Sequence, residues 1–188
     1  TRDGGRLCGV RRRGETGMGL EGELQVLKTM RQRSFTTDAV SHSAASSACE
    51  KGKCWEQARR LLKEMLQRSL TPDAVSHSAA ISACEKGKCW EEALRLLQEM
   101  LQRSLTPDAV SHSAAISACE KGKCWEEALR LLQEMHTRSL TPDAVSHSAA
   151  ISACEKGKRC EEALRLLQEM LQRSLMHDAV SHRAAISA

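Results

Sequence analysis

The sequence predicts an all-α protein in which antiparallel helix pairs stack into an α-solenoid. The first observation is a repeat of 35 residues, marked by evenly spaced aspartates: Asp38, Asp73, Asp108, Asp143 and Asp178. The second is that each repeat holds two segments with helical rather than strand-like residue patterns. Repeats of about 20–50 residues are typical of solenoids, in which each unit buries its apolar face only against its neighbours.

The repeats fill residues 38–188 as four complete units followed by a truncated one. Residues 1–37 come before them, and Glu21–Met30 aligns with Glu56–Met65 of the first complete unit. We therefore expect residues 1–37 to be a degenerate repeat or the remnant of a leader, rather than a separate domain. Because the chain starts at Thr1 and stops within a repeat, we expect a fragment of a longer chain, and no targeting peptide is visible in it.

The first helix of a unit is expected to begin after Asp73, since Asp at this place accepts hydrogen bonds from free backbone N–H groups. Pro72 suits the start of a helix. The helix then runs through small residues such as Ala80 and Ala83, which allow a neighbouring backbone to approach closely. Gly87 is expected to supply the left-handed conformation that ends the helix.

The second helix is expected from about Trp90 to Gln102. Its apolar side chains recur at spacings of three and four and form one stripe: Trp90, Ala93, Leu94, Leu97, Met100 and Leu101. The tryptophans at the start of these helices, Trp55, Trp90 and Trp125, are expected to be partly buried against a neighbouring unit. The fourth unit carries Cys160 in their place, so we expect it to be the weakest stack.

The composition excludes several classes of protein. The chain is 41% hydrophobic and 28% charged, with a net charge of +4, which fits a folded protein and permits, without requiring, an acidic partner such as RNA. No run approaches the roughly 18 apolar residues that cross a bilayer, so no membrane partner is expected. The nine cysteines follow the repeat rather than a pairing scheme, which favours a reducing compartment over a disulfide framework.

The sequence predicts neither a metal site nor an active site. The pair Cys84 and Cys89 recurs in three units, but the fourth unit replaces its second cysteine with Arg159, and a structural zinc site needs four ligands. Cys84 is therefore expected to be a small packing residue. His77 has a copy in every unit, whereas a catalytic histidine belongs to one site beside a nucleophile or carboxylate. We expect no enzyme activity, no catalytic residues and no cofactor.

The phrase PDAVSHSAAISACEKGKCWEEALRLLQEM, which begins at Pro72, resembles the pentatricopeptide repeat. The likeness extends from Asp38 to Ala188, and the repeats look like P-type units in tandem. The residues in register with the family pattern include Ile81, Ala83, Gly87, Ala93, Leu94, Leu96, Met100, Pro107 and Asp108. One departure is His77-Ser78, where the family has Tyr-Asn.

This resemblance implies a right-handed α-solenoid that binds single-stranded RNA along a concave groove, with one nucleotide per repeat. It also implies a role in organellar RNA processing, stability, editing or translation, in a chloroplast or a mitochondrion. The implied base-reading pairs are Ser43 with Asp73, Ser78 with Asp108, Ser113 with Asp143, and Ser148 with Asp178. The implied base-sandwiching residues are Val40, Val75, Val110, Val145 and Val180.

The paired serine and aspartate favour guanine among the bases. A carboxylate only accepts hydrogen bonds, and the pairing edge of guanine offers two adjacent donors. Adenine and uracil each place an acceptor beside a single donor. A serine hydroxyl donates or accepts and so adapts to what remains. Because all four pairs are identical, the predicted partner is a short, G-rich single strand.

Each of these residues also has a simpler explanation. Aspartate caps helices in many proteins. Lysines near the end of the first helix contact phosphates or offset the helix dipole; they are Lys86, Lys88, Lys121 and Lys123. For the whole chain, the alternative is a protein-binding helical-repeat scaffold without RNA, which the low net charge and the missing Tyr-Asn favour. An RNA-binding array with additional protein partners is also left open.

Overall fold

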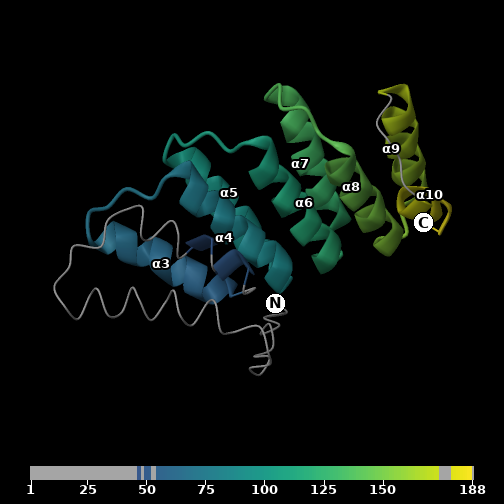
Figure 1. Cartoon of the computed structure of the whole chain (residues 1–188). Helices are drawn as coiled ribbons and strands as arrows, with labels where there is room; N and C mark the ends of the chain where they lie inside the picture. Colours follow the sequence, from purple (N-terminus) through teal and green to yellow (C-terminus); the bar gives the residue numbers. More distant parts are fainter. Residues whose placement is uncertain (1–45, 48, 52–53, 174–178, 188) are drawn as a thin grey trace, which may run out of the picture.

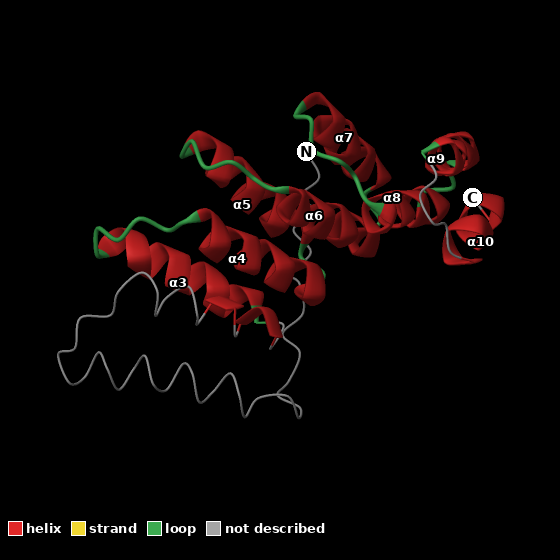
Figure 2. Ribbon diagram, turned by 45° about the horizontal axis from the view of Figure 1, so that its top comes forward, coloured by secondary structure: helices red, strands yellow, loops and turns green. Residues whose placement is uncertain are grey.

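The computed structural model describes residues 46–47, 49–51, 54–173 and 179–187, and Figure 2 shows only helices and loops in these ranges. The labelled helices are α3 (Trp55–Gln67), α4 (Ala74–Gly87), α5 (Trp90–Gln102), α6 (Ala109–Gly122), α7 (Trp125–Thr137), α8 (Ala144–Lys156), α9 (Cys160–Gln172) and α10 (Ala179–Ser187). The predicted all-α class is confirmed for the described residues, and so are the two helices of the second, third and fourth units.

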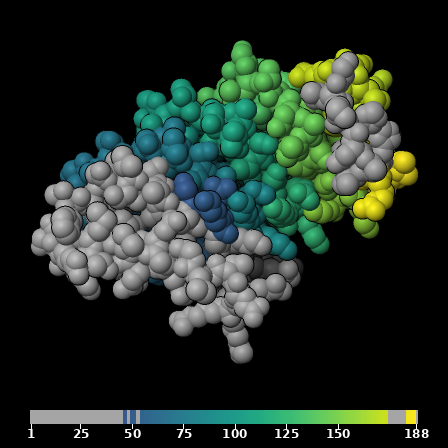
Figure 3. Space-filling view, viewed as in Figure 1, coloured from purple at the N-terminus to yellow at the C-terminus, as the bar shows by residue number. Residues whose placement is uncertain are grey.

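The helix pairs stack in chain order, so that colour runs smoothly from one end of the molecule to the other (Figures 1 and 3). The first helices α4, α6, α8 and α10 each pack directly on the next, and each second helix packs on the first helices around it. Consecutive second helices, such as α5 and α7, have no Cα atoms within 8 Å of each other. The array is therefore narrower on the side of the first helices, which is the concave side, as expected.

The core alternates small residues from first helices with larger residues from second helices. In the second unit Ala80, Ile81 and Ala83 of α4 are completely buried, as is Met100 of α5. The apolar stripe of α5 lies slightly to one side of its predicted position, because Leu96 is buried whereas Leu94 and Leu101 are half-buried. The small side chains permit the close stacking of first helices that their sequence predicts.

The prediction that Gly87 adopts the left-handed conformation is wrong. Gly87 ends α4 with an ordinary backbone, and Lys88 has the positive φ of 61°. The glycine is needed for space, since a Cβ at this position would lie 2.5 Å from Cδ1 of Trp55 in the preceding unit. Gly122 and Gly157 meet Trp90 and Trp125 in the same way.

The tryptophan prediction is confirmed, because Trp55, Trp90 and Trp125 begin second helices and are half-buried against the next unit. The fourth unit differs. Cys160 is exposed, and the guanidinium of Arg159 lies 4.5 Å from the ring centroid of Trp125. This cation–π contact covers part of the indole between units three and four.

Several residues for which the sequence makes predictions lie outside the described ranges. Residues 1–37, Val40, Ser43 and Asp178 are not among the described residues, and the side chain of Val180 is not described. Within the described ranges, no helix has both the length and the apolar character needed to cross a bilayer.

Candidate nucleic-acid interface

A stripe of exposed valines follows the start of the first helices. Val75, Val110 and Val145 are 61%, 62% and 60% exposed, although each is a large apolar residue in a regular helix. Each lies two positions after a capping aspartate, and each has neighbours at the same place in the adjoining units. An apolar surface repeated at one position per unit can contact the faces of unpaired bases.

Next to the valines, a buried serine joins the two members of the predicted base-reading pairs Ser78–Asp108 and Ser113–Asp143. Oγ of Ser111 lies 3.1 Å from Oγ of Ser78 and 2.7 Å from Oδ1 of Asp108. The backbone N–H of Ser111 also donates to Oδ1 of Asp108, at 2.8 Å. Ser78 belongs to α4, whereas Asp108 caps α6. The structure therefore brings the predicted pair together through the first turn of the following helix.

The protons in this chain of contacts decide what the site offers to a ligand. Ser111 has one hydroxyl proton, and a carboxylate only accepts, so that proton goes to Asp108. Ser78 must then donate its own proton to Ser111, which leaves the oxygen of Ser78 as an acceptor. Both described hydrogen bonds to Asp108 use Oδ1, so Oδ2 provides a second acceptor. Two acceptors bridged by the same serine match a ligand edge with two donors.

The same arrangement is repeated one unit further along. Oγ of Ser146 lies 3.1 Å from Oγ of Ser113 and 2.7 Å from Oδ1 of Asp143, and its N–H donates to Oδ1 at 2.8 Å. These two pairs are the ones for which the structure describes both members. Ser148 is described without Asp178, and Asp73 without Ser43.

The aspartates also cap the first helices, so the simpler explanation and the binding explanation coexist. Asp73 accepts from the N–H of Ser76 at 2.8 Å and from its hydroxyl at 2.7 Å. Partial burial raises the pKa of Asp73, but these hydrogen bonds outweigh it, and the pKa lies below its ordinary value. This carboxyl is ionised at neutral pH and works as an acceptor.

Two of the four predicted phosphate-binding lysines form ion pairs between units. Nζ of Lys86 lies 2.8 Å from Oε1 of Glu50, and Nζ of Lys121 lies 2.5 Å from Oε1 of Glu85. Lys156 pairs with Glu120 in the same way, at 2.6 Å. We call these three contacts the Lys–Glu ladder. A phosphate would have to compete with a glutamate for each lysine, a restraint that the sequence did not reveal.

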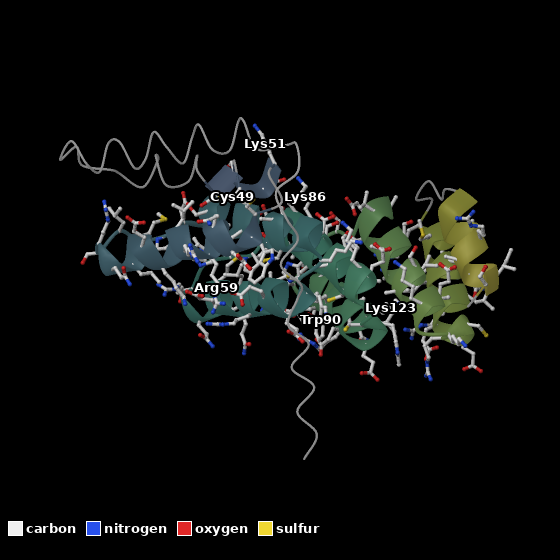
Figure 4. The ribbon with its side chains drawn as sticks, turned by 90° about the horizontal axis from the view of Figure 1, so that it is seen from below. Cys49, Lys51, Arg59, Lys86, Trp90 and Lys123 are labelled. Atoms are coloured by element: carbon white, nitrogen blue, oxygen red, sulfur yellow. The ribbon has the colours of Figure 1, made fainter. Side chains whose placement is uncertain are left out.

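The other two lysines, Lys88 and Lys123, are exposed at the left-handed turns after the first helices. In Figure 4, Lys51 and Lys86 lie toward one edge of the array, and Trp90 and Lys123 toward the other. The four lysines therefore do not form one basic patch, and their role in phosphate binding stays a prediction.

The recurring cysteines behave as packing residues. Cys84, Cys119 and Cys154 are completely buried and free of disulfides. Burial raises the pKa of the Cys84 thiol well above its ordinary value, that of Cys119 to about 12 and that of Cys154 to about 11. These thiols stay protonated at neutral pH, which does not suit nucleophilic attack.

Comparison with protein families identifies the repeat. The PPR repeat model matches four stretches, residues 40–70, 75–105, 110–140 and 145–175, which together make up more than half of the chain. The chain belongs to the pentatricopeptide repeat family. A comparison with curated proteins finds no match.

Solved pentatricopeptide repeat structures share this fold. PPR10 from maize aligns with a TM-score of 0.75 and 21% identity over 89% of this chain and 24% of its own. PPR10 in complex with an 18-nt psaJ RNA element aligns with a TM-score of 0.71, again at 21% identity over 89% of this chain. The PPR domain of Arabidopsis thaliana protein-only RNase P 1, in complex with tRNA, aligns with a TM-score of 0.75 and 11% identity over 87% of this chain and 86% of its own. This chain spans about a quarter of PPR10.

One residue of the candidate site was not predicted from the sequence, namely the serine that joins the members of the two described pairs. Ser76, Ser111 and Ser146 are completely buried polar residues directly after the exposed valines. Their identity in each unit was visible in the repeated VSHS phrase. What the phrase did not reveal is that Ser111 and Ser146 also contact a serine of the preceding unit.

Proposed function

We propose that this pentatricopeptide repeat array binds single-stranded RNA along its concave side, with one nucleotide per module of valine, serine and aspartate. The observation that carries the proposal is the juxtaposition of an exposed valine with a pair of hydrogen-bond acceptors, repeated at the same place along the first helices. The valine provides a surface for the face of a base, and the two acceptors recognise the hydrogen-bond donors on its edge.

Guanine is the base that fits the acceptor pair best. Its N1–H and its N2 amino group are adjacent donors, and they would meet the oxygen of Ser78 and Oδ2 of Asp108. The other bases each present an acceptor that would face one of these oxygens. The proposal therefore includes a preference for G-rich strands, now supported by the proton count as well as by the likeness to the family. It extends to the incomplete pairs, Ser43 with Asp73 and Ser148 with Asp178.

The electrostatics support weak binding with a shallow dependence on salt. The net charge is +4, and the Lys–Glu ladder pairs its lysines with glutamates. Few counterions would be released when RNA binds, so the logarithm of the affinity should fall slowly with the logarithm of the salt concentration. A place in organellar RNA processing, stability, editing or translation, in a chloroplast or a mitochondrion, and a role without enzyme activity complete the proposal.

The test is a competition among 8-nt homopolymers of G, A, C and U, followed by fluorescence anisotropy, with the G strand held in a buffer without K⁺ so that it stays single. The matched variant is Asp108→Asn with Asp143→Asn, because Asn caps a helix as well as Asp does but replaces an acceptor oxygen with a donor. We expect the wild type to prefer G, and the variant to lose at least about tenfold in affinity for G, on the basis of about 1–3 kcal/mol per base contact.

A second variant separates the base face from the base edge. Val75, Val110 and Val145 are mostly exposed, so their replacement with Ala should change stability by less than about 0.5 kcal/mol each while weakening all four strands alike. Equal binding of all four homopolymers by the wild type would overturn the guanine preference and leave the aspartates as helix caps. No binding of any homopolymer would overturn the proposal and favour a protein-binding scaffold.

A further inference from the structure

Three side chains of types that ligate metal ions meet where units three and four pack, between the second helices α7 and α9 and the first helix α8. His136 belongs to α7, His147 to α8 and Glu169 to α9. One ligand atom from each lies within 4.8 Å of the other two. A cleft of about 570 Å³ between α7 and α9, lined by His136, Glu169 and neighbours such as Leu132 and Leu166, leads to the cluster from solvent.

The buried histidine of the cluster points a free lone pair at a carboxylate. His147 is completely buried, and its Nδ1 lies 3.1 Å from the backbone carbonyl oxygen of Asp143, to which it can donate. Nε2 then carries no proton, has no hydrogen-bond partner, and lies 3.9 Å from Oε1 of Glu169. A carbonyl that fixes the ring in this way is the usual partner of a metal-binding histidine.

The second histidine completes the set. Nε2 of His136 is buried and lies 3.2 Å from the same oxygen of Glu169, in an orientation that forms no hydrogen bond. The two imidazole rings are tilted by 58°, with their centroids 6.3 Å apart. Two imidazole nitrogens and one carboxylate oxygen thus converge on one point from three helices.

We propose that His136, His147 and Glu169 bind one divalent transition-metal ion, with zinc as the best fit. Zinc accepts imidazole nitrogen and carboxylate oxygen at about 2.0–2.2 Å in a tetrahedron, which places ligand atoms about 3.3 Å from one another. Small side-chain rotations close the present separations to this value, and water takes the fourth position. Because the ligands come from adjacent units, the ion ties unit three to unit four. This site is independent of the proposed RNA-binding surface.

The neighbouring unit contains the same arrangement without the third ligand. Nδ1 of His112 lies 3.1 Å from the carbonyl oxygen of Asp108, and its Nε2 lies 3.9 Å from Oε1 of Glu134. The residue that corresponds to His136 there is Leu101. The blocks Asp73–Pro107 and Asp108–Pro142 differ at only two positions, and one of them is the change from Leu101 to His136 that adds the third ligand.

Arg173 competes with the ion. Its Nη2 lies 2.9 Å from Oε1 of Glu169, and its Nη1 lies 3.4 Å from Nδ1 of His136. The side chain of Arg173 is 44% exposed, so its guanidinium can turn into solvent when an ion enters. Removal of its charge should strengthen metal binding.

The experiment titrates the full, reduced 188-residue chain with Co²⁺, followed by its visible d–d absorption, and then displaces the Co²⁺ with Zn²⁺. We expect one ion per chain, with no thiolate charge-transfer band in the near ultraviolet. The variant His136→Leu restores the residue of the neighbouring unit and should weaken binding by more than about tenfold. Leu101→His should raise the stoichiometry to two, and Arg173→Gln should tighten binding.

Each result decides the proposal without reference to RNA. Circular dichroism establishes that the variants are folded, and Zn²⁺ should raise the melting temperature of the wild type but not that of His136→Leu. Equal affinity of the wild type and His136→Leu, or a spectrum dominated by thiolate, would overturn the site. The Leu101→His prediction assumes that His112 and Glu134 are arranged like His147 and Glu169. If this variant still binds a single ion, the proposed site is refuted.

Discussion

At the scale of single residues, the contact between a tryptophan and a glycine fixes the distance between units. Trp55 lies on Gly87, Trp90 on Gly122 and Trp125 on Gly157. A glycine near a helix end normally signals a left-handed backbone, but here Lys88 and its copies adopt it and the glycine makes room for an indole. The indole fills the space that the missing Cβ leaves, so neither the tryptophan nor the glycine can change size without a change in the other.

Replacement of Gly122 with Ala should therefore destabilise the array. In an ordinary helix this change stabilises by about 0.5–1 kcal/mol, whereas here the new methyl group would overlap the ring of Trp90. We expect a net loss of about 1–3 kcal/mol, measured by urea unfolding. In a Trp90→Ala background the same substitution should lose its cost, and an equal cost in both backgrounds would contradict the steric explanation.

At the scale of the helix, the first and second helices are stabilised in different ways. The second helices have one apolar stripe, buried in unit two through Ala93, Leu96 and Met100. The first helices are short of large side chains, and they are covered by the first helices on either side and by second helices. Their start depends on the aspartate cap and the serine three residues later.

Asp73→Ala should cost about 1 kcal/mol at pH 7, whereas Asp73→Asn should cost close to nothing. The folded-state pKa of Asp73 is below its ordinary 3.8, so its stabilisation is fully present above pH 3.8 and is lost as the pH falls through the folded-state pKa. Thermal melts at pH 7 and near pH 2 provide the measurement. If the wild type and the Asp73→Ala variant differ in stability at the acidic pH as much as they do at pH 7, the carboxylate charge contributes nothing to the cap.

At the scale of the whole molecule, each unit depends on the units beside it. Leu164 and Leu171 of α9 are each 50% exposed, whereas the corresponding Leu94 and Leu101 of α5 are half-buried. In the part of the chain that the structure describes, no second helix follows α9 to cover them. The fourth unit also lacks the tryptophan that the preceding units place on their neighbours.

Hydrogen exchange should therefore be faster in α9 than in α5. The uncovered leucines forgo about 1–3 kcal/mol of burial, and stability in a repeat array is a sum of local and nearest-neighbour contributions. We expect backbone amides of α9 to exchange about tenfold faster or more, with α5 and α7 the most protected. Uniform protection from α3 to α9 would mean that the array unfolds as a single unit.

Interactions between residues close together in the sequence determine much of this structure, and for that reason much of the fold could be predicted from the sequence. The 35-residue step, the start of α4 after Asp73 and the limits of α5 at Trp90 and Gln102 all depend on caps and on periodicities that the sequence displays. The valines of the candidate site came instead from the resemblance to the pentatricopeptide repeat family, since no cap or periodicity marks them. Their exposure follows from their place on the concave side of a helix whose other faces are covered.

Contacts between units were decided only by the tertiary structure. The space that Gly87 leaves for Trp55, the pairing of Lys86 with Glu50, the bridge from Ser111 to Ser78 and the approach of His136 to Glu169 each join residues 32–36 positions apart. A repeat places such residues near one another, but the offset and the rotation of one helix pair on the next decide which atoms meet. That offset results from the packing of whole units, and no local pattern of residues contains it.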